Sequence, residues 1–235
     1  MGRQSLNYEE GSTNPALQPD WNTPAGRALA ALSKAIQGQG IVLSSPILVF
    51  GSAPLQICVD PALLSADVDI AVREQEEVVK KLVEEVGLAK GKTPFYIEVV
   101  PEYVFRPGPN WRERAMLFTL NTVQFLFPAA LDILLAKLRR LDQKDMRAFE
   151  LVLKKTGRPT ETELICELRA SYDIFYYQKD GRKSALWENT EKLWTHIFRR
   201  QIDVRAEIIQ PVLDQFAEAG MAPDYLAELR DRLGL

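Results

Sequence analysis

The chain has 235 residues and a formal net charge of −3, from 29 Lys and Arg against 32 Asp and Glu side chains. This balance gives no overall attraction to nucleic acid or to a membrane surface, so such contacts would depend on a local basic face. No apolar stretch approaches the roughly 20 residues that span a bilayer, and no leader-like segment is evident, so we expect a cytoplasmic protein without membrane contact.

The histidine and cysteine content excludes several kinds of catalysis. His196 is the only histidine, and Cys58 and Cys166 lie far apart in apolar segments. A zinc site built from histidine and cysteine ligands cannot be assembled from these residues. No Gly-x-Ser-x-Gly elbow accompanies His196 to indicate a hydrolase triad. Carboxylates must therefore carry any catalysis.

The first part of the chain combines helical and extended patterns. Residues 1–23 show no hydrophobic period and are predicted to form an extended arm. Hydrophobic spacing predicts a helix over 24–38 and strands over 47–50 and 68–72. A short helix is predicted after Ser52, which can cap it.

The middle of the chain continues this mixed pattern. A charged amphipathic helix is predicted over 74–86 and a third strand over 95–100. Strands over 116–120 and 123–127 are predicted to form a hairpin that turns at Asn121-Thr122.

The remainder of the chain has helical spacing. A long helix is predicted from Pro128 to about Lys155, and further helices over 161–178, 185–216 and 223–233. The composition changes near residues 157–159. We therefore expect an α/β (α+β) protein, with a mixed β-sheet domain flanked by helices over 24–157 and a helical domain over 158–235.

Two aspartates are the main candidates for a metal site. Asp67 and Asp69 face the same side of a predicted strand, so their carboxylates repel each other. A cation such as Mg²⁺ or Mn²⁺ takes hard oxygen ligands and removes this repulsion. A third carboxylate would allow a two-metal site for in-line displacement. Glu98 is preferred over Glu102 as this ligand, because Pro101 ends the regular strand ladder before Glu102.

A Gly-Ser turn precedes the acidic pair along the chain. Gly51 and Ser52 follow a buried strand, where backbone N–H groups and a hydroxyl can approach a phosphate. The same dipeptide also occurs in plain turns and helix caps, and an isolated Asp-x-Asp has low specificity. The order of the two motifs makes each more informative than it is alone.

The predicted long helix is rich in basic residues. Lys137 follows core-facing leucines, so it either extends to the surface or has a buried anionic partner. The basic face of this helix can hold a triphosphate or a nucleic-acid backbone, or it can be a solvated face.

These motifs resemble a known superfamily. Gly51-Ser52 followed by Asp67-Val68-Asp69-Ile70 resembles the signature of the DNA polymerase β-like nucleotidyltransferases. The segment 131–138, which contains Lys137, together with Lys144-Asp145, is similar to the helix of the branch that includes the AbiEii and MenT-type toxins and related bacterial proteins.

The resemblance implies roles for individual residues. Asp67 and Asp69 would bind metal, Gly51-Ser52 would hold the triphosphate, and Lys137 would reach a phosphate or steady an acidic partner, with Asp145 close to the same site. It implies a metal-dependent enzyme that moves a nucleoside monophosphate from an NTP to an acceptor hydroxyl on tRNA or a protein. A toxin role with a cognate antitoxin is also implied.

Two other interpretations stay open at this point. The fold can serve as a catalytically weak or inactive nucleotide-binding or protein-interaction module. An Asp-x-Asp motif with a metal is also used by sugar-nucleotide glycosyltransferases, although their nucleotide-binding domain is usually larger.

Overall fold

The computed structural model describes residues 18–63, 65 and 67–234. The predicted arm lies outside the described residues up to residue 17. In the described part of the chain, none of the helices combines the length and the apolar character needed to cross a bilayer.

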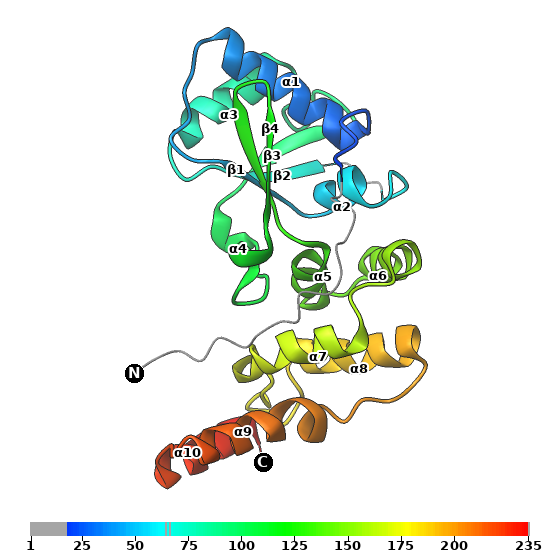
Figure 1. Ribbon diagram of the computed structural model, residues 1–235, viewed down its shortest axis with the longest axis vertical. Coiled ribbons are helices and arrows are strands. Elements are labelled where there is room, and N and C mark those ends of the chain that lie inside the picture. Colours follow the sequence, from blue (N-terminus) through cyan, green and yellow to red (C-terminus); the bar gives the residue numbers. More distant parts are fainter. Residues whose placement is uncertain (1–17, 64, 66, 235) are drawn as a thin grey trace.

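Within the described residues, a five-stranded mixed sheet forms the core of the first half of the chain (Figure 1). The strand order is β3-β2-β1-β5-β4. β1 pairs antiparallel with β2 and parallel with β5, while β2 pairs parallel with β3 and β4 pairs antiparallel with β5. The strands are β1 (Ile47–Phe50), β2 (Asp67–Ala71), β3 (Tyr96–Val99), β4 (Met116–Leu120) and β5 (Val123–Phe127). The predicted mixed sheet and its terminal hairpin are confirmed.

The two faces of the sheet have different roles. Val68 and Ile70 of β2 are fully buried in an apolar cluster shared with α1 (Pro24–Gly38) and α3 (Glu76–Glu85). Because successive side chains of a strand point to opposite faces, Asp67, Asp69 and Ala71 lie on the other face. That second face therefore carries the acidic pair.

Helices α5 and α6 lie between the sheet and the last helices of the chain (Figure 1). One continuous apolar cluster runs from α5 and α6 through the helices that follow. The remaining elements are α2 (Ala53–Cys58), η1 (Glu102–Val104), α4 (Trp111–Arg114), α5 (Ala130–Leu138), α6 (Gln143–Thr156), α7 (Glu161–Arg169), η2 (Tyr172–Ile174), α8 (Ala185–Leu193), η3 (Trp194–Phe198), η4 (Arg205–Ile209), α9 (Gln210–Glu218) and α10 (Pro223–Leu233). The domain boundary near residue 157 stays a prediction.

The long helix predicted from Pro128 to about Lys155 is wrong, because the chain forms two helices there. α5 ends at Leu138, Leu141 takes the left-handed conformation with φ 46°, and Asp142 begins α6. Asp142 accepts a hydrogen bond from the Asp145 backbone N–H, and the Asp145 carboxylate accepts one from the Asp142 N–H. This capping box lies inside a continuous hydrophobic period, which is why the period alone predicts one helix.

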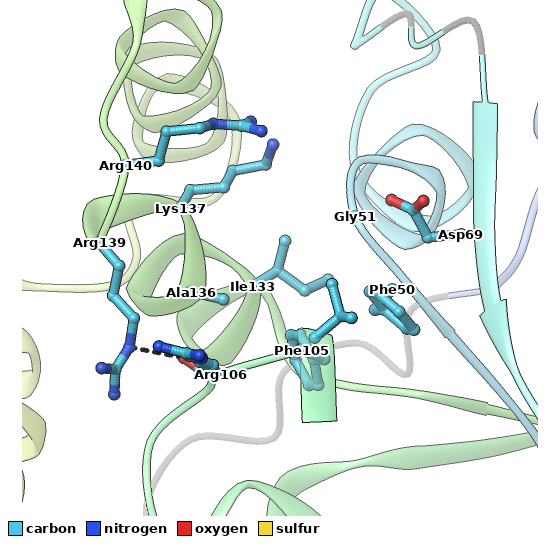
Figure 2. Close-up of a pocket in the computed structure, with 11 residues that line it drawn as sticks. Phe50, Gly51, Asp69, Phe105, Arg106, Ile133, Ala136, Lys137, Arg139 and Arg140 are labelled. Carbon is cyan, nitrogen blue, oxygen red and sulfur yellow. Dashed lines mark hydrogen bonds between the residues drawn. The ribbon is translucent and has the colours of Figure 1, made fainter. Parts of the chain in front are cut away.

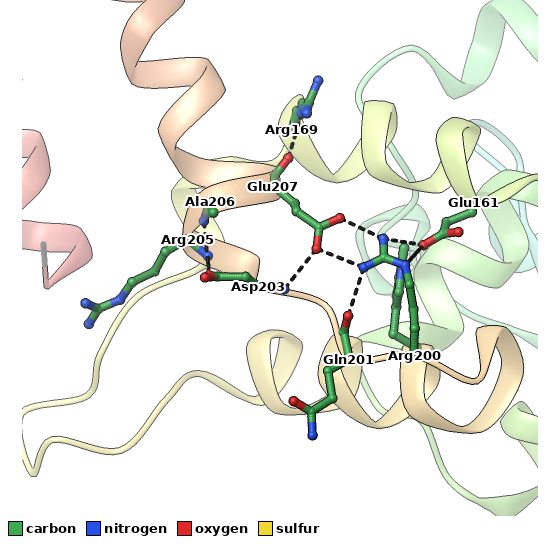
Figure 3. A network of polar contacts seen from close by, with 9 residues as sticks. Glu161, Arg169, Arg200, Gln201, Asp203, Arg205, Ala206 and Glu207 are labelled. Atoms are coloured by element: carbon green, nitrogen blue, oxygen red, sulfur yellow. Dashed lines mark hydrogen bonds and ion pairs between the residues drawn. The ribbon is translucent and has the colours of Figure 1, made fainter.

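The single helices predicted over 161–178 and 185–216 are also shorter than expected. α7 ends at Arg169, and the second segment breaks after the π-helical turn η3, where Arg199 has φ 56°. The next residue, Arg200, pairs with Glu161 of α7 and donates two hydrogen bonds to Glu207 of η4, at 2.9 and 2.7 Å (Figure 3). These ion pairs hold the break against α7.

Candidate active site

The sheet brings the three predicted carboxylates together. Asp69 of β2 lies opposite Glu98 of β3 in the parallel ladder, and Asp67 lies two positions before Asp69. One carboxylate oxygen from each of the three lies within 4.8 Å of the other two. All three side chains are partly buried, and all lie on the same face of the sheet. We call Asp67, Asp69 and Glu98 the acidic cluster.

The electrostatics of the acidic cluster suit a hard cation. Burial, together with the negative charges of Asp67 and Glu98, raises the pKa of Asp69 to about 6, although the charges of Lys137 and Arg140 act in the opposite direction. Carboxylate oxygens are the ligands that Mg²⁺ and Mn²⁺ prefer, and a divalent ion would offset the repulsion among them. The acidic cluster can therefore hold a divalent metal ion.

Glu102, the alternative third ligand, has different partners. It lies in η1 and forms ion pairs with Arg73, at 3.1 Å, and with Arg112. Glu98 instead lies in the acidic cluster, with Lys90 at 3.7 Å as its ion-pair partner. The geometry favours Glu98, the ligand predicted from the sequence because Pro101 ends the regular strand ladder before Glu102.

Position 51 has to be glycine because it lies against the Asp69 carboxylate of the acidic cluster. Its φ is 68°, and a Cβ atom placed there would lie 2.3 Å from Oδ2 of Asp69. Only glycine gives both the left-handed conformation and the space for this carboxylate. Ser52 takes the N-cap position of α2, but among the described residues its hydroxyl makes no capping hydrogen bond. Ser52 therefore stands at the predicted N-cap position without making the expected hydrogen bond.

Lys137 has the buried anionic partner that the sequence allowed. Its Nζ donates to Oδ1 of Asp145 at 2.9 Å, and Arg140 donates to both oxygens of the same carboxylate, at 3.0 and 3.1 Å. Asp145 is fully buried. Burial alone would raise its pKa, but the hydrogen bonds and charges of Arg140 and Lys137 hold that pKa below its usual value. Asp145 thus fixes two cations rather than facing the site itself.

A cavity of about 280 Å³ lies between these cations and Asp69 of the acidic cluster. Gly51 and Asp69 lie on its sheet side, and Lys137 and Arg140 lie on the side of α5 (Figure 2). Its volume is close to the lower end of the range for small-molecule clefts, roughly 300 Å³. The other lining residues are Phe50, Val104, Phe105, Arg106, Ile133, Ala136 and Arg139.

The connection between β3 and β4 contributes residues that sequence patterns did not identify. Phe105 stacks on Phe50 with ring centroids 5.2 Å apart, and Arg106 follows it into the cavity lining. This connection has no hydrophobic period, so nothing in its local spacing indicates that it reaches the site. Its position depends on packing against β1 and α5.

Comparison with known proteins gives one match. The family described as "Nucleotidyltransferase of unknown function (DUF6036)" matches residues 28–183, a segment that contains the acidic cluster, Lys137 and Asp145. No curated protein and no solved structure matches the chain. Because the family match covers more than half of the sequence, the chain belongs to this family of nucleotidyltransferases.

Proposed function

We propose that the protein is a Mg²⁺- or Mn²⁺-dependent enzyme that transfers a nucleoside monophosphate from an NTP to an acceptor hydroxyl. The observation that carries this proposal is the acidic cluster, whose Asp69 faces Lys137 and Arg140 across a cavity. Asp67, Asp69 and Glu98 would hold the metal, which supplies charge neutralisation at the transferred phosphate. The two cations then bind the outer phosphates of the triphosphate.

The proposed reaction is an in-line displacement. The acceptor oxygen forms a bond to the α-phosphorus of the NTP, and the bond from that phosphorus to the bridging oxygen of the β-phosphate breaks. Pyrophosphate leaves with the electron pair of the broken bond. A carboxylate of the acidic cluster accepts the proton of the acceptor hydroxyl.

The residues around the cavity are proposed to contribute mainly by positioning. Asp145 holds Lys137 and Arg140 in place before substrate arrives, so little reorganisation is needed when the triphosphate binds. Gly51 and Ser52 are proposed to offer backbone N–H groups to a phosphate. Charge neutralisation and alignment supply most of the rate acceleration in such transfers.

We extend the proposal to the kind of molecule that carries the acceptor hydroxyl and to the biological role of the enzyme. By resemblance to the AbiEii and MenT-type branch, the acceptor hydroxyl would lie on tRNA or on a protein, and the enzyme would act as a toxin with a cognate antitoxin. Induced expression of the wild-type chain should then arrest growth, and expression of Asp69→Ala should not. Equal growth of the two cultures would contradict the toxin role without affecting the transferase proposal.

The central experiment measures transfer directly. Each NTP, labelled at the α-phosphate, is incubated with the protein, a divalent metal and total RNA or total protein, and label in the macromolecules is counted. Wild type should transfer label, Asp69→Ala should lose at least about a hundred-fold of that activity, and Asp214→Ala on the exposed side of α9 should retain it.

The same assay separates the proposal from its alternative. Binding of NTP without transfer of any label would indicate the catalytically inactive nucleotide-binding module. Label that is unchanged in Asp69→Ala would remove the acidic cluster from the mechanism.

A further inference from the structure

The four cations that line the cavity form two pairs with different partners. Lys137 and Arg140 share the carboxylate of Asp145. Within the described part of the chain, Arg106 and Arg139 form no ion pair with any carboxylate. Arg139 instead donates a hydrogen bond from Nε to the backbone oxygen of Arg106, at 3.1 Å (Figure 2). We call Arg106 and Arg139 the second cation pair.

The second cation pair carries unneutralised positive charge. Burial lowers the pKa of Arg139, the charge of Arg106 lowers it further, and only Asp173 acts on Arg139 in the opposite direction. Guanidinium groups bind phosphate oxygens through two parallel hydrogen bonds, and an anion bound here would relieve the repulsion between the two arginines. The second cation pair is therefore suited to a phosphate group.

The triphosphate of an NTP is served by the other pair. Lys137 and Arg140 extend into the cavity toward Asp69, whereas Arg139 and Arg106 lie together farther from that carboxylate (Figure 2). Transfer requires the α-phosphate to lie at the acidic cluster, so the remaining phosphates fall near Lys137 and Arg140. The second cation pair is left for a different phosphate.

An exposed aromatic residue directly precedes, in the sequence, the residues of the β3–β4 connection that line the cavity. Tyr103 is 76% exposed, and the following residue, Val104, is 53% exposed and lines the cavity. The short helix η1 that carries them is held by ion pairs from Glu102 to Arg73 and Arg112. Tyr103 precedes Arg106 by three residues in the same connection, and exposed aromatic rings and arginines together bind single-stranded nucleic acid, by base stacking and by contacts to the backbone.

We propose that Arg106 and Arg139 bind a backbone phosphate of a single-stranded nucleic-acid acceptor, with Tyr103 stacking on a neighbouring base. The inference deepens the proposed function and rests on it, because it names nucleic acid rather than protein as the acceptor class. The acceptor strand enters along η1 and brings its hydroxyl to the acidic cluster.

The test measures binding of a fluorescein-labelled single-stranded RNA oligonucleotide of mixed sequence by anisotropy, with the full chain and without NTP or metal. The variant Arg106→Gln/Arg139→Gln should bind at least about ten-fold more weakly, because it loses charge-assisted hydrogen bonds. The slope of log affinity against log salt should also fall by about one for each lost phosphate contact. Tyr103→Ala should weaken binding at every salt concentration and leave this slope unchanged.

The matched control is Arg230→Gln/Arg232→Gln, which removes the same charge from exposed positions on α10. It should keep wild-type RNA affinity. NTP binding, measured by thermal shift with Mg²⁺ and a non-hydrolysable NTP, should be unchanged in Arg106→Gln/Arg139→Gln and weakened in Lys137→Ala. A DNA oligonucleotide of the same sequence shows whether the sugar is read in addition to the phosphate.

Two outcomes would overturn the inference. One is an equal loss of RNA affinity in the α10 control, which would show that only net charge matters. The other is loss of NTP binding with unchanged RNA binding in Arg106→Gln/Arg139→Gln, which would assign these arginines to the triphosphate. Because RNA binding is measured without NTP or metal, absence of transferase activity would count against the proposed function but not against this subsite.

Discussion

Gly51 and Asp69 form the tightest residue-level constraint of the site. A Cβ atom at position 51 would lie 2.3 Å from Oδ2 of Asp69, so the two residues depend on each other. The acidic cluster also keeps three carboxylate oxygens within 4.8 Å of one another. We therefore expect this crowded, like-charged arrangement to be needed for function and to lower the stability of the folded protein.

Gly51→Ala should separate the steric role of this glycine from its conformational role. The added methyl group displaces the Asp69 carboxylate, so transferase activity should fall at least about ten-fold. Alanine is also strained in the left-handed conformation of this position, so the free energy of unfolding should fall by about 1 kcal/mol.

The control for this variant is Gly87→Ala. Gly87 has φ 72°, but a Cβ atom there meets nothing within 4 Å. It should lose similar stability in urea denaturation and keep full activity. A parallel loss of activity in both variants would show that backbone strain, rather than displacement of Asp69, is responsible.

Asp69→Asn should stabilise the protein when metal is chelated. Burial and the charges of Asp67 and Glu98 disfavour the ionised form of Asp69 and raise its pKa to about 6. Removing this charge should raise the free energy of unfolding by about 2 kcal/mol at neutral pH in EDTA. In excess Mg²⁺ the gain should disappear, because the ion stabilises only the wild-type site. Unfolding curves in the two buffers check this, and a variant that is less stable in both would contradict it.

At the scale of single elements, the junction of α5 and α6 links folding to the site. Asp145 closes the capping box of α6 and also accepts hydrogen bonds from Lys137 and Arg140. One carboxylate therefore begins a helix and orients two cations on the preceding helix and turn. The interruption between the two helices is what turns Lys137 and Arg140 toward a common partner.

Asp145→Asn should weaken both the junction and NTP binding. It leaves two cations without their buried partner, so the free energy of unfolding should fall by about 3 kcal/mol at neutral pH, and the KM for NTP should rise more than kcat falls. The control Asp214→Asn, at an exposed position of α9, should leave both nearly unchanged.

The pH dependence of this effect has a defined sign. The folded protein holds the pKa of Asp145 below its usual value, so the carboxylate contributes stability above the unfolded pKa of about 4. That contribution is lost as the pH falls through the lower folded pKa. The stability difference between wild type and Asp145→Asn should therefore shrink in acid, and a difference that grows there would contradict this assignment.

At the scale of the whole molecule, Arg114 connects the sheet to the helices beyond it. It is the last residue of α4, within the β3–β4 connection, and donates hydrogen bonds to Asp132 of α5, at 3.1 and 2.6 Å, and to Glu167 of α7, at 2.6 and 3.0 Å. Asp132 is fully buried and Glu167 nearly so. A single guanidinium thus satisfies two buried carboxylates from different helices.

Arg114→Met should be one of the most damaging single substitutions. Two buried acids lose their cation, so the free energy of unfolding should fall by about 3–5 kcal/mol. The variant Arg114→Met/Asp132→Asn/Glu167→Gln should recover part of this loss, because the uncompensated charges are gone. Arg182→Met, which breaks an exposed pair with Asp180, should change stability little. A triple variant no more stable than Arg114→Met in urea denaturation would show that packing, rather than charge, accounts for the loss.

The sequence by itself determined the sheet strands, the acidic pair and the nucleotidyltransferase assignment. The strands and the acidic pair depend on local signals: alternation along Asp67–Ile70, the apolar strand before Gly51, and a hairpin with a two-residue turn. The nucleotidyltransferase assignment came from the resemblance of the Gly-Ser and Asp-x-Asp motifs to a known superfamily, and the family match supports it. Glu98 could be chosen over Glu102 because Pro101 ends the regular strand ladder between them. The branch of the superfamily, the domain boundary and the roles of the individual site residues stay predictions.

Only the tertiary structure decided how the cations reach the site. The break after Leu138 was hidden because the hydrophobic period continues through Asp142, and the capping box competes with that period by satisfying backbone N–H groups. Arg106 and Phe105 come from a connection without any period, and they line the cavity because Phe50 and α5 provide surfaces to pack against. Contacts between residues far apart in the chain leave no local pattern, so the second cation pair could be found only after the chain was folded.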